Sequence, residues 1–264
     1  MARVKLTGKR AVVVGGGSGM GRATAELLRA EGLEVAILDL AHSRGAEVAE
    51  AIGAHFFACD IGDHDGTERA LSEAVAAIGG LHVAVNVAGG GGPGRRLIDA
   101  SGPYPLAEYR RVVELNLIAS FNLDRLEAWH MRDNAPEDQE RGVIINTSSI
   151  AADAGPVGMI HYSSSKAGVS GLSLGVARDL APYGIRCMAI APSLFETGLI
   201  EGMQDEDRTR LVSETVFPKR PGRPQEFALM VRAIVENPML NGGTIRLDAG
   251  TRRAVADNLG DTLF

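Results

Sequence analysis

The stretch AVVVGGGSGMG, residues 11–21, decides the fold of this chain. It begins as a short β-branched run that ends in glycine. Helical spacing of apolar residues follows from Ala23 to Ala30, so the stretch predicts a strand, a turn and a helix. Glycines have no Cβ and let backbone N–H groups approach a ligand, and a helix N-terminus favours negative charge. A glycine-rich turn in this position therefore predicts a site for the pyrophosphate of a dinucleotide.

The same alternation of strand and helix continues along the chain. The apolar strand runs are continuous, which is typical of parallel strands buried between two layers of helices. We therefore predict an α/β fold, a single-domain Rossmann-type doubly wound parallel sheet with helices on both faces, over residues 1–264. The Gly- and Pro-rich residues 89–105 are expected to form an insertion loop where ligand sites form. Beyond the first strand, we expect strands at 34–40, 55–61, 81–89, 142–149 and 185–192, and helices at 45–52, 66–78, 106–132 and 159–180.

Composition argues against several classes of function. The net charge of −6 disfavours a nucleic-acid partner, which needs clustered Lys and Arg. No apolar run approaches the roughly 18 residues that a membrane span needs. Cys59 and Cys187 are too few for a disulfide framework or a metal cluster, so no metal is expected. Since no targeting segment is recognised near Met1, we expect a cytoplasmic protein that acts on a small molecule.

Asp39 ends the second predicted strand, twenty residues after Gly19. A carboxylate there can accept hydrogen bonds from the ribose hydroxyls of NAD and repels the additional phosphate of NADP. Neither Ser18 nor Leu40 supplies a cation that would offset this repulsion. The sequence thus favours NAD as the cofactor. The alternative is a strand-end carboxylate that binds only the amides of its turn.

Tyr162 and Lys166 lie four residues apart in a predicted helix, so their side chains share one face. With four Tyr and four Lys in the chain, about 0.06 such pairs are expected by chance. An ammonium about 4 Å from a phenol lowers its pKa from about 10 to about 7 at an effective dielectric of about 20, before desolvation takes back part of this lowering. Tyr162 is therefore predicted to exchange a proton, while the Ser149 hydroxyl donates to a developing oxyanion. The alternatives are a surface Tyr beside a Lys and a turn-forming Ser.

The motifs along the chain resemble those of the short-chain dehydrogenase/reductase family. In order they are VGGGSGMG, NVAG at 86–89, Asn116 within ELNLIASFN, Ser149, and the Tyr162/Lys166 pair. The resemblance implies a catalytic tetrad in which Tyr162 exchanges the proton and Lys166 holds the ribose and lowers the Tyr pKa. It further implies that Ser149 binds the substrate oxygen and that Asn116 positions a water. The chain departs from the family pattern outside the tetrad, at Val14, Val87 and Ser193.

Within that family, segments such as AVNVAG, RGVIINTSSIAA, ARDLAPYGIR and IAPSLFETGL resemble the short-chain (type II) 3-hydroxyacyl-CoA dehydrogenase and 17β-hydroxysteroid dehydrogenase group. The resemblance implies NAD-linked oxidation of a 3-hydroxyacyl-CoA to its 3-oxo form, with Asp60 near the adenine and Thr197 near the carboxamide. The implied cofactor contacts are Gly15, Ser18, Gly19, Met20, Gly21, Asp39, Leu40, Asp60, Ile61, Asn86, Val87, Ala88, Gly89, Tyr162, Lys166, Pro192, Phe195 and Thr197.

Three other functions stay open. One is an NAD-dependent dehydrogenase of another secondary alcohol or hydroxysteroid. A carrier-linked ketoacyl reductase is another, disfavoured because such enzymes generally use NADPH and Asp39 opposes it. The third is a non-catalytic NAD-binding scaffold, against which the tetrad argues.

The substrate side is less sharply defined by the sequence. Residues 194–223 mix apolar positions without a strand pattern and are interpreted as a substrate lid, with a pair of packed helices as the alternative. Five basic residues could attract the phosphates of CoA or form solvated surface charge. They are Arg95, Arg96, Lys219, Arg220 and Arg223. The family resemblance also implies a homotetramer built on the long helices near Arg110 and Ser170.

Overall fold

A central sheet of seven parallel strands organises the computed structural model, which describes residues 6–198 and 212–252. The strand order is β3-β2-β1-β4-β7-β8-β9, so the chain reverses its direction of travel across the sheet between β1 and β4. Ligands bind outside the carboxyl ends of strands at such a switch point. The strands are β1 (Arg10–Val14), β2 (Glu34–Asp39), β3 (His55–Ala58), β4 (Val83–Asn86), β7 (Gly142–Thr147), β8 (Ile185–Pro192) and β9 (Thr244–Leu247).

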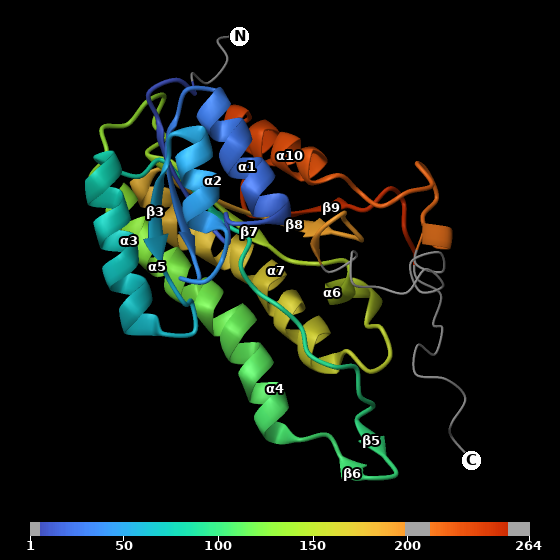
Figure 1. Cartoon of the computed structure of the whole chain (residues 1–264). Helices are drawn as coiled ribbons and strands as arrows, with labels where there is room; N and C mark the ends of the chain where they lie inside the picture. Colours follow the sequence, from blue (N-terminus) through green and yellow to red (C-terminus); the bar gives the residue numbers. More distant parts are fainter. Residues whose placement is uncertain (1–5, 199–211, 253–264) are drawn as a thin grey trace.

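Helices cover both faces of this sheet, as predicted (Figure 1). Inward side chains of α1, α2 and α10 form one core cluster with alternate strand residues, and those of α3, α5 and α7 form the other. Strands packed between two such layers bury both of their faces, which explains their continuous apolar runs. The helices are α1 (Gly19–Ala30), α2 (Gly45–Ile52), α3 (His64–Ile78), α4 (Leu106–Val113), α5 (Ala119–Met131), α6 (Ala151–Ala154), α7 (Ile160–Leu180) and α10 (Pro224–Glu236), with a 3₁₀ turn η2 at Ala181–Tyr183.

The long helix predicted at 106–132 differs from the structure in its middle. A π-helical turn, η1 (Glu114–Ile118), separates α4 from α5. Such a turn adds one residue to the helical repeat, and the spacing of apolar residues alone does not reveal it. The predicted insertion loop at 89–105 is present and carries a short hairpin, β5 (Ile98–Asp99) and β6 (Gly102–Pro103). In Figure 1 the hairpin lies beyond the end of α4, away from the sheet.

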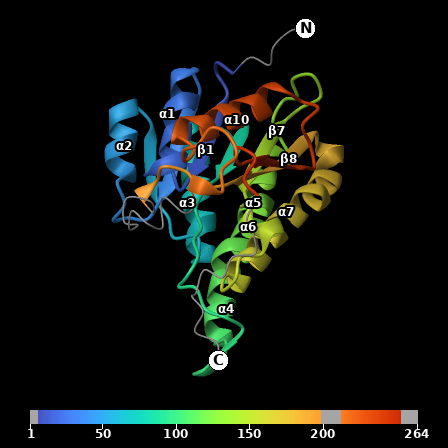
Figure 2. The same cartoon turned by 90° about the vertical axis from the view of Figure 1, so that its right-hand side faces the viewer.

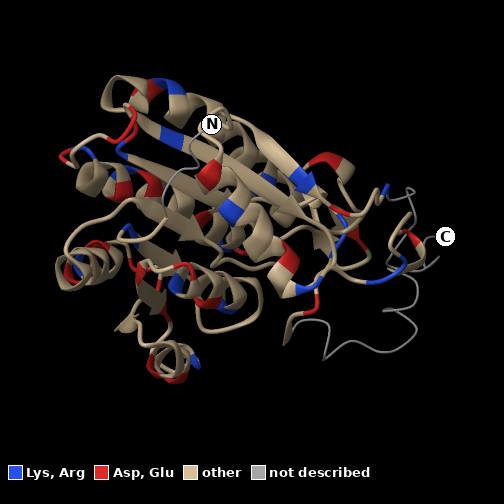
Figure 3. Cartoon of the chain, turned by 90° about the horizontal axis from the view of Figure 1, so that it is seen from above, with Lys and Arg blue, Asp and Glu red and all other residues tan. Residues whose placement is uncertain are grey.

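Positive and negative side chains are mixed over the described part of the molecule. Seen from above in Figure 3, Lys and Arg alternate with Asp and Glu over the helices and loops. No helix among the described residues is long and apolar enough to cross a membrane. Within residues 6–198 and 212–252, no group of three or more His, Cys, Asp or Glu is arranged to hold a metal ion.

Candidate active site

A groove of about 400 Å³ opens at the carboxyl ends of β1, β2 and β4, at the switch point of the sheet. This volume lies within the range of small-molecule and cofactor sites. Most of the cofactor contacts implied by the family resemblance line it, so the structure brings these residues together, and their contact with a cofactor stays a prediction. The lining residues are Val14, Gly15, Ser18, Gly19, Met20, Leu38, Asp39, Leu40, Cys59, Asp60, Ile61, Val87, Ala88, Gly89, Leu115 and Thr197.

The glycine turn between β1 and α1 packs so tightly against neighbouring backbone that Gly15 and Gly21 leave no room for a side chain. Gly15 has a φ of +83°, and a Cβ on it would lie 2.7 Å from the backbone nitrogen of Ala88. A Cβ on Gly21 would overlap the carbonyl oxygen of Gly15, so this third glycine allows α1 to pack on the turn. The turn therefore brings the N-terminus of α1 against the groove, which is the arrangement that binds a pyrophosphate.

Asp39 lies in the groove and accepts two backbone hydrogen bonds. Its Oδ2 accepts from the N–H of Gly17 and its Oδ1 from the N–H of Leu40, both at 2.7 Å. Asp39 therefore does bind the amides of its turn, which was the alternative interpretation of this residue in the sequence analysis. Each carboxylate oxygen has a second lone pair, so the same contacts hold Asp39 in a fixed orientation and leave acceptors for ribose hydroxyls. Asp60, at the next strand end, is held similarly because its Oδ1 accepts from the N–H of Gly62 at 2.9 Å.

Lys166 is held beneath Tyr162 on the same face of α7. Its Nζ donates to the carbonyl oxygen of Thr147 at 2.7 Å and lies 5.8 Å from the centroid of the Tyr162 ring. Complete burial lowers the pKa of the Lys166 ammonium to about 8. An ammonium with a pKa so close to neutrality can keep its charge at pH 7 and still exchange a proton with a bound group.

The pKa of Tyr162 differs from our sequence-based expectation. Loss of contact with water raises it above the usual value of 10, and a hydrogen bond with the Ser149 side chain lowers it by less. We expected the ammonium of Lys166 to dominate, whereas burial of the phenol is the largest cause of the shift in pKa. The Ser149 hydroxyl also accepts from the N–H of Ala151 at 3.1 Å, which fixes its position beside Tyr162. The tetrad alone thus leaves Tyr162 protonated, as an acid that can donate to a ketone oxygen.

The π turn η1 places Asn116 at the same centre. Its Nδ2 donates to the carbonyl oxygens of Val112 at 2.8 Å and Gly90 at 2.7 Å, and its Oδ1 accepts from the N–H of Gly90 at 3.1 Å. A Cβ on Gly89 would lie 2.7 Å from the Asn116 Oδ1 and 3.3 Å from the Lys166 Nζ. Gly89, which lines the groove, therefore lies against Asn116 and Lys166 of the tetrad.

Besides Tyr162 and Lys166, four of the implied cofactor contacts lie outside the groove lining. Gly21 packs beneath the turn, and Pro192 ends β8 in the buried sheet. Phe195 is buried edge-on against Phe227, with ring centroids 6.4 Å apart. The Asn86 side chain donates to the Asn146 Oδ1 at 3.0 Å, on the face of the sheet that α5 covers. Any contact that these residues make with a cofactor would come from their backbone, and it stays a prediction.

The basic residues near the substrate side make local contacts. The Arg95 Nε donates to Asp99 at 2.7 Å, and the Arg220 Nη2 donates to Glu226 at 2.6 Å. The Lys219 Nζ donates to the carbonyl oxygen of Ser213 at 3.3 Å. These contacts favour the alternative of ordinary surface charge. Of the lid at 194–223, residues 199–211 lie outside the described part of the chain, including Leu199, Ile200, Met203 and Leu211.

The sequence prediction missed a buried pair of acids on α5. Asp124 and Glu127 face the sheet and are buried, three residues apart. Asn146 Nδ2 donates to the Asp124 Oδ1 at 2.8 Å, and Asn86 Nδ2 donates to the Glu127 Oε2 at 3.1 Å. Burial raises the pKa of Asp124 to about 7 and that of Glu127 to about 8. The available sequence signal was two acids three residues apart within the predicted helix 106–132.

Known proteins are similar to this chain over most of its length. The sequence profile of a family described as short chain dehydrogenase matches residues 9–208. The 3-hydroxyacyl-CoA dehydrogenase type-2 of Homo sapiens is 43% identical over 251 residues, which cover 94% of this chain and 96% of that protein. Ipsdienol dehydrogenase of Ips pini is 32% identical over 256 residues, covering 94% of this chain and 99% of the other. A crystal structure of 3-hydroxyacyl-CoA dehydrogenase type-2 from Mycobacterium avium matches with a TM-score of 0.90 and 35% identity, covering 94% of this chain and 98% of that one.

Proposed function

Because the chain belongs to the short-chain dehydrogenase family, we propose that it interconverts a 3-hydroxyacyl-CoA and the 3-oxoacyl-CoA with NAD as the hydride carrier. The observation that carries the cofactor assignment is Asp39, oriented by Gly17 and Leu40 at the wall of the groove. Its negative charge opposes the additional phosphate of NADP. The substrate assignment is supported by the relatives named 3-hydroxyacyl-CoA dehydrogenase type-2 and by the segments that resemble that group.

The residues of the tetrad divide the proton chemistry among them. When bound, NAD supplies the acceptor for the hydride that leaves the carbinol carbon. In the oxidative direction, the Tyr162 Oη takes the hydroxyl proton of the substrate, and in reduction it returns that proton to the ketone oxygen. The Ser149 hydroxyl donates to the same oxygen and stabilises the negative charge that develops on it. Lys166, buried beneath Tyr162, favours the phenolate through its positive charge.

The raised pKa of Tyr162 makes its role depend on the other charges of the loaded site. Burial alone favours the neutral phenol, which is the form that ketone reduction requires. Oxidation requires the phenolate, and Lys166 and the positive charge of oxidised nicotinamide both favour that form. We therefore expect oxidation to need a higher pH than reduction.

Purified protein tests the proposal with acetoacetyl-CoA as the probe. We expect turnover with NADH, and at least about tenfold lower kcat/KM with NADPH because of Asp39. Turnover of simple or steroid ketones without turnover of acetoacetyl-CoA would contradict the substrate assignment. Equal use of NADH and NADPH would contradict the cofactor assignment.

A second candidate is an NAD-dependent dehydrogenase of another secondary alcohol or hydroxysteroid. The local pairs of Arg95 with Asp99 and of Arg220 with Glu226 favour it, because they occupy charges that a CoA phosphate would use. The similarity to ipsdienol dehydrogenase also supports a substrate without CoA. A panel of secondary alcohols and NAD, compared with 3-hydroxybutyryl-CoA under the same conditions, distinguishes the two candidates.

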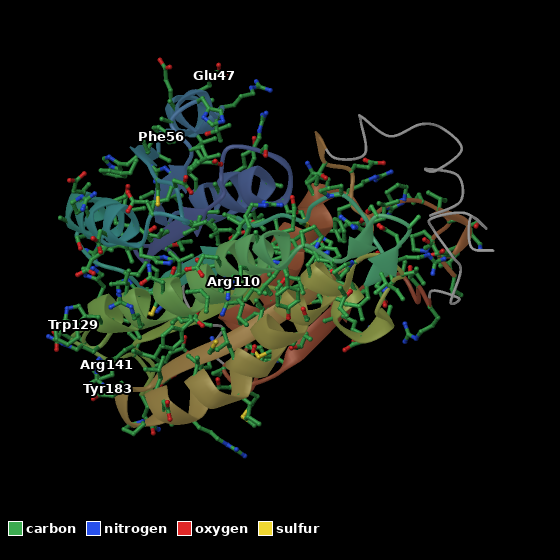
Figure 4. The ribbon with its side chains drawn as sticks, turned by 90° about the horizontal axis from the view of Figure 1, so that it is seen from below. Glu47, Phe56, Arg110, Trp129, Arg141 and Tyr183 are labelled. Carbon is green, nitrogen blue, oxygen red and sulfur yellow. The ribbon has the colours of Figure 1, made fainter. Side chains whose placement is uncertain are left out.

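We further propose a homotetramer in the cytoplasm. Apolar side chains are exposed along η1, α5 and α7, at Ile118, Phe121, Trp129 and Leu174. Figure 2 shows α5 and α7 as neighbours, and Figure 4 labels Trp129 at one end of the molecule and Arg110 nearer its middle. An exposed apolar surface of this kind is typical of association. Both cysteines are free, which suits a reducing compartment. Light scattering after size-exclusion chromatography measures the oligomeric state.

A further inference from the structure

His161 directly precedes Tyr162 in the first turn of α7. Its side chain is fully buried between α7 and the loop 89–105. The ring stacks on Tyr104, with centroids 5.5 Å apart and planes inclined by 28°. Neither ring nitrogen has a well-formed hydrogen bond to the described residues. The ring nonetheless faces Gly92 of the loop, whose backbone acts on it as a hydrogen-bond partner, and the charged side chains of Glu108 and Arg111 lie nearby.

The loop passes through a narrow gap that His161 helps to form. A Cβ on Gly92 would lie 3.0 Å from the Arg111 Nη2, 3.5 Å from the His161 Nε2 and 3.6 Å from the Glu108 Oε2. One residue earlier, a Cβ on Gly91 would lie 3.8 Å from the Cδ2 of Tyr162. The loop backbone thus runs beside the Tyr162 ring at Gly91 and enters the gap at Gly92. Because the two residues are adjacent, the position of Gly92 in the gap constrains the position of Gly91 beside Tyr162.

Among the described residues, further contacts hold the loop near its start and in its middle. Near its start, Gly90 is bound by the Asn116 side chain through donor and acceptor bonds. In its middle, the N–H of Arg95 donates to the carbonyl oxygen of Gly158 at 2.9 Å. Its outer part returns through the hairpin β5–β6, and Tyr104 connects that part to α7 through the stack on His161. Loss of this stack would leave residues 96–105 without that connection.

We propose that His161 is a positioning residue that holds loop 89–105 against Tyr162 and thereby shapes the substrate side of the active site. The cofactor groove reaches the tetrad at Gly89, so the following residues of the loop border the space left for the substrate. Loosening the loop should weaken the binding of substrate while leaving the cofactor groove intact. The identity of that substrate rests on the proposed function, whereas the anchoring of the loop does not.

Three variants test the proposal: His161→Ala, Tyr104→Ala and His161→Phe. Amide hydrogen exchange in residues 89–105 should be about tenfold faster in the two alanine variants, which lose a stacked pair. His161→Phe keeps an aromatic ring and should stay within about threefold of the wild type. In acetoacetyl-CoA reduction, His161→Ala and Tyr104→Ala should raise KM about tenfold, with kcat and the Kd for NADH each changed by less than about threefold.

Each outcome of these measurements supports or overturns the proposed role of His161 in holding loop 89–105. Unchanged exchange in Tyr104→Ala, or exchange in His161→Phe as fast as in His161→Ala, would overturn the proposal. A fall in kcat without a rise in KM, or an equal loss of NADH binding, would show a general structural role instead. If His161→Ala fails to fold, Tyr104→Ala carries the test because Tyr104 lies on the half-buried outer loop. A wild-type protein inactive on acetoacetyl-CoA would refute the substrate assignment alone, since the exchange comparison uses no substrate.

Discussion

Replacing Glu127 by Gln should stabilise the protein at neutral and alkaline pH. The Glu127 carboxyl is buried on the inner face of α5, where its Oε2 accepts from the Asn86 Nδ2. Burial and then the nearby Asp124 carboxyl raise its pKa to about 8, and the Asn86 hydrogen bond lowers it by less. A Gln side chain has the shape of the protonated acid and can accept the same hydrogen bond. It carries no charge at any pH.

The size of the effect follows from the pKa values of the folded and unfolded chains. Between the usual value of 4.5 and about 8, the folded protein keeps a proton that the unfolded chain has released. Folding then takes up a proton, so the free energy of unfolding falls as pH rises through this window and levels off above it. At 1.36 kcal/mol per pH unit, the loss reaches about 3 kcal/mol at pH 7. Glu127→Gln removes this loss.

Urea unfolding at pH 5, 7 and 8.5, at one protein concentration, measures the difference between the variant and the wild type. We expect a difference below about 1 kcal/mol at pH 5 that grows to about 3 kcal/mol at pH 7. Glu47→Gln, at an exposed position on α2 labelled in Figure 4, is the matched control and should show no such growth. A stability difference for Glu127→Gln that does not change with pH would refute the reasoning.

Three further substitutions probe the groove and the tetrad. Asp39→Asn keeps the shape of the side chain but removes its charge, so the ratio of kcat/KM with NADH to that with NADPH should fall at least about tenfold; an unchanged ratio contradicts the role of Asp39. Gly21→Ala places a Cβ against the Gly15 carbonyl and should cost about 1–3 kcal/mol of stability, whereas Gly171→Ala, with open space around it, should be neutral or stabilising. Lys166→Met removes the buried ammonium, so the pH profile of alcohol oxidation should shift upward; an unshifted profile contradicts its effect on the Tyr162 pKa.

Features encoded in contiguous residues were predictable from the sequence. The turn at 15–21 joins a strand to a helix within one short stretch, so its ligand site follows from local geometry. Tyr162 and Lys166 share a helical face through their spacing alone. The strand at 185–192 was predicted with the bounds that the structure has, because its apolar run is continuous and ends at a proline.

Features that depend on distant contacts were not predictable in the same way. The π turn at Asn116 depends on how α4 and α5 pack, because each segment reads as an ordinary helix. The raised pKa of Tyr162 required its burial, which no local pattern specifies. The Phe195 side chain packs on Phe227, a residue of the unpredicted helix α10. The stack of His161 on Tyr104 joins two segments far apart in the chain.

Replacing Tyr162 by Phe tests the central claim most directly, because it removes only the hydroxyl oxygen that exchanges the proton. The measurement is NADH oxidation with acetoacetyl-CoA, alongside NADH binding followed by its fluorescence. We expect turnover to fall at least about a hundredfold, in keeping with the loss of a general acid, while the Kd for NADH stays within about threefold. Turnover close to that of the wild type, with NADH bound equally well, would contradict the assignment of Tyr162 as the catalytic acid.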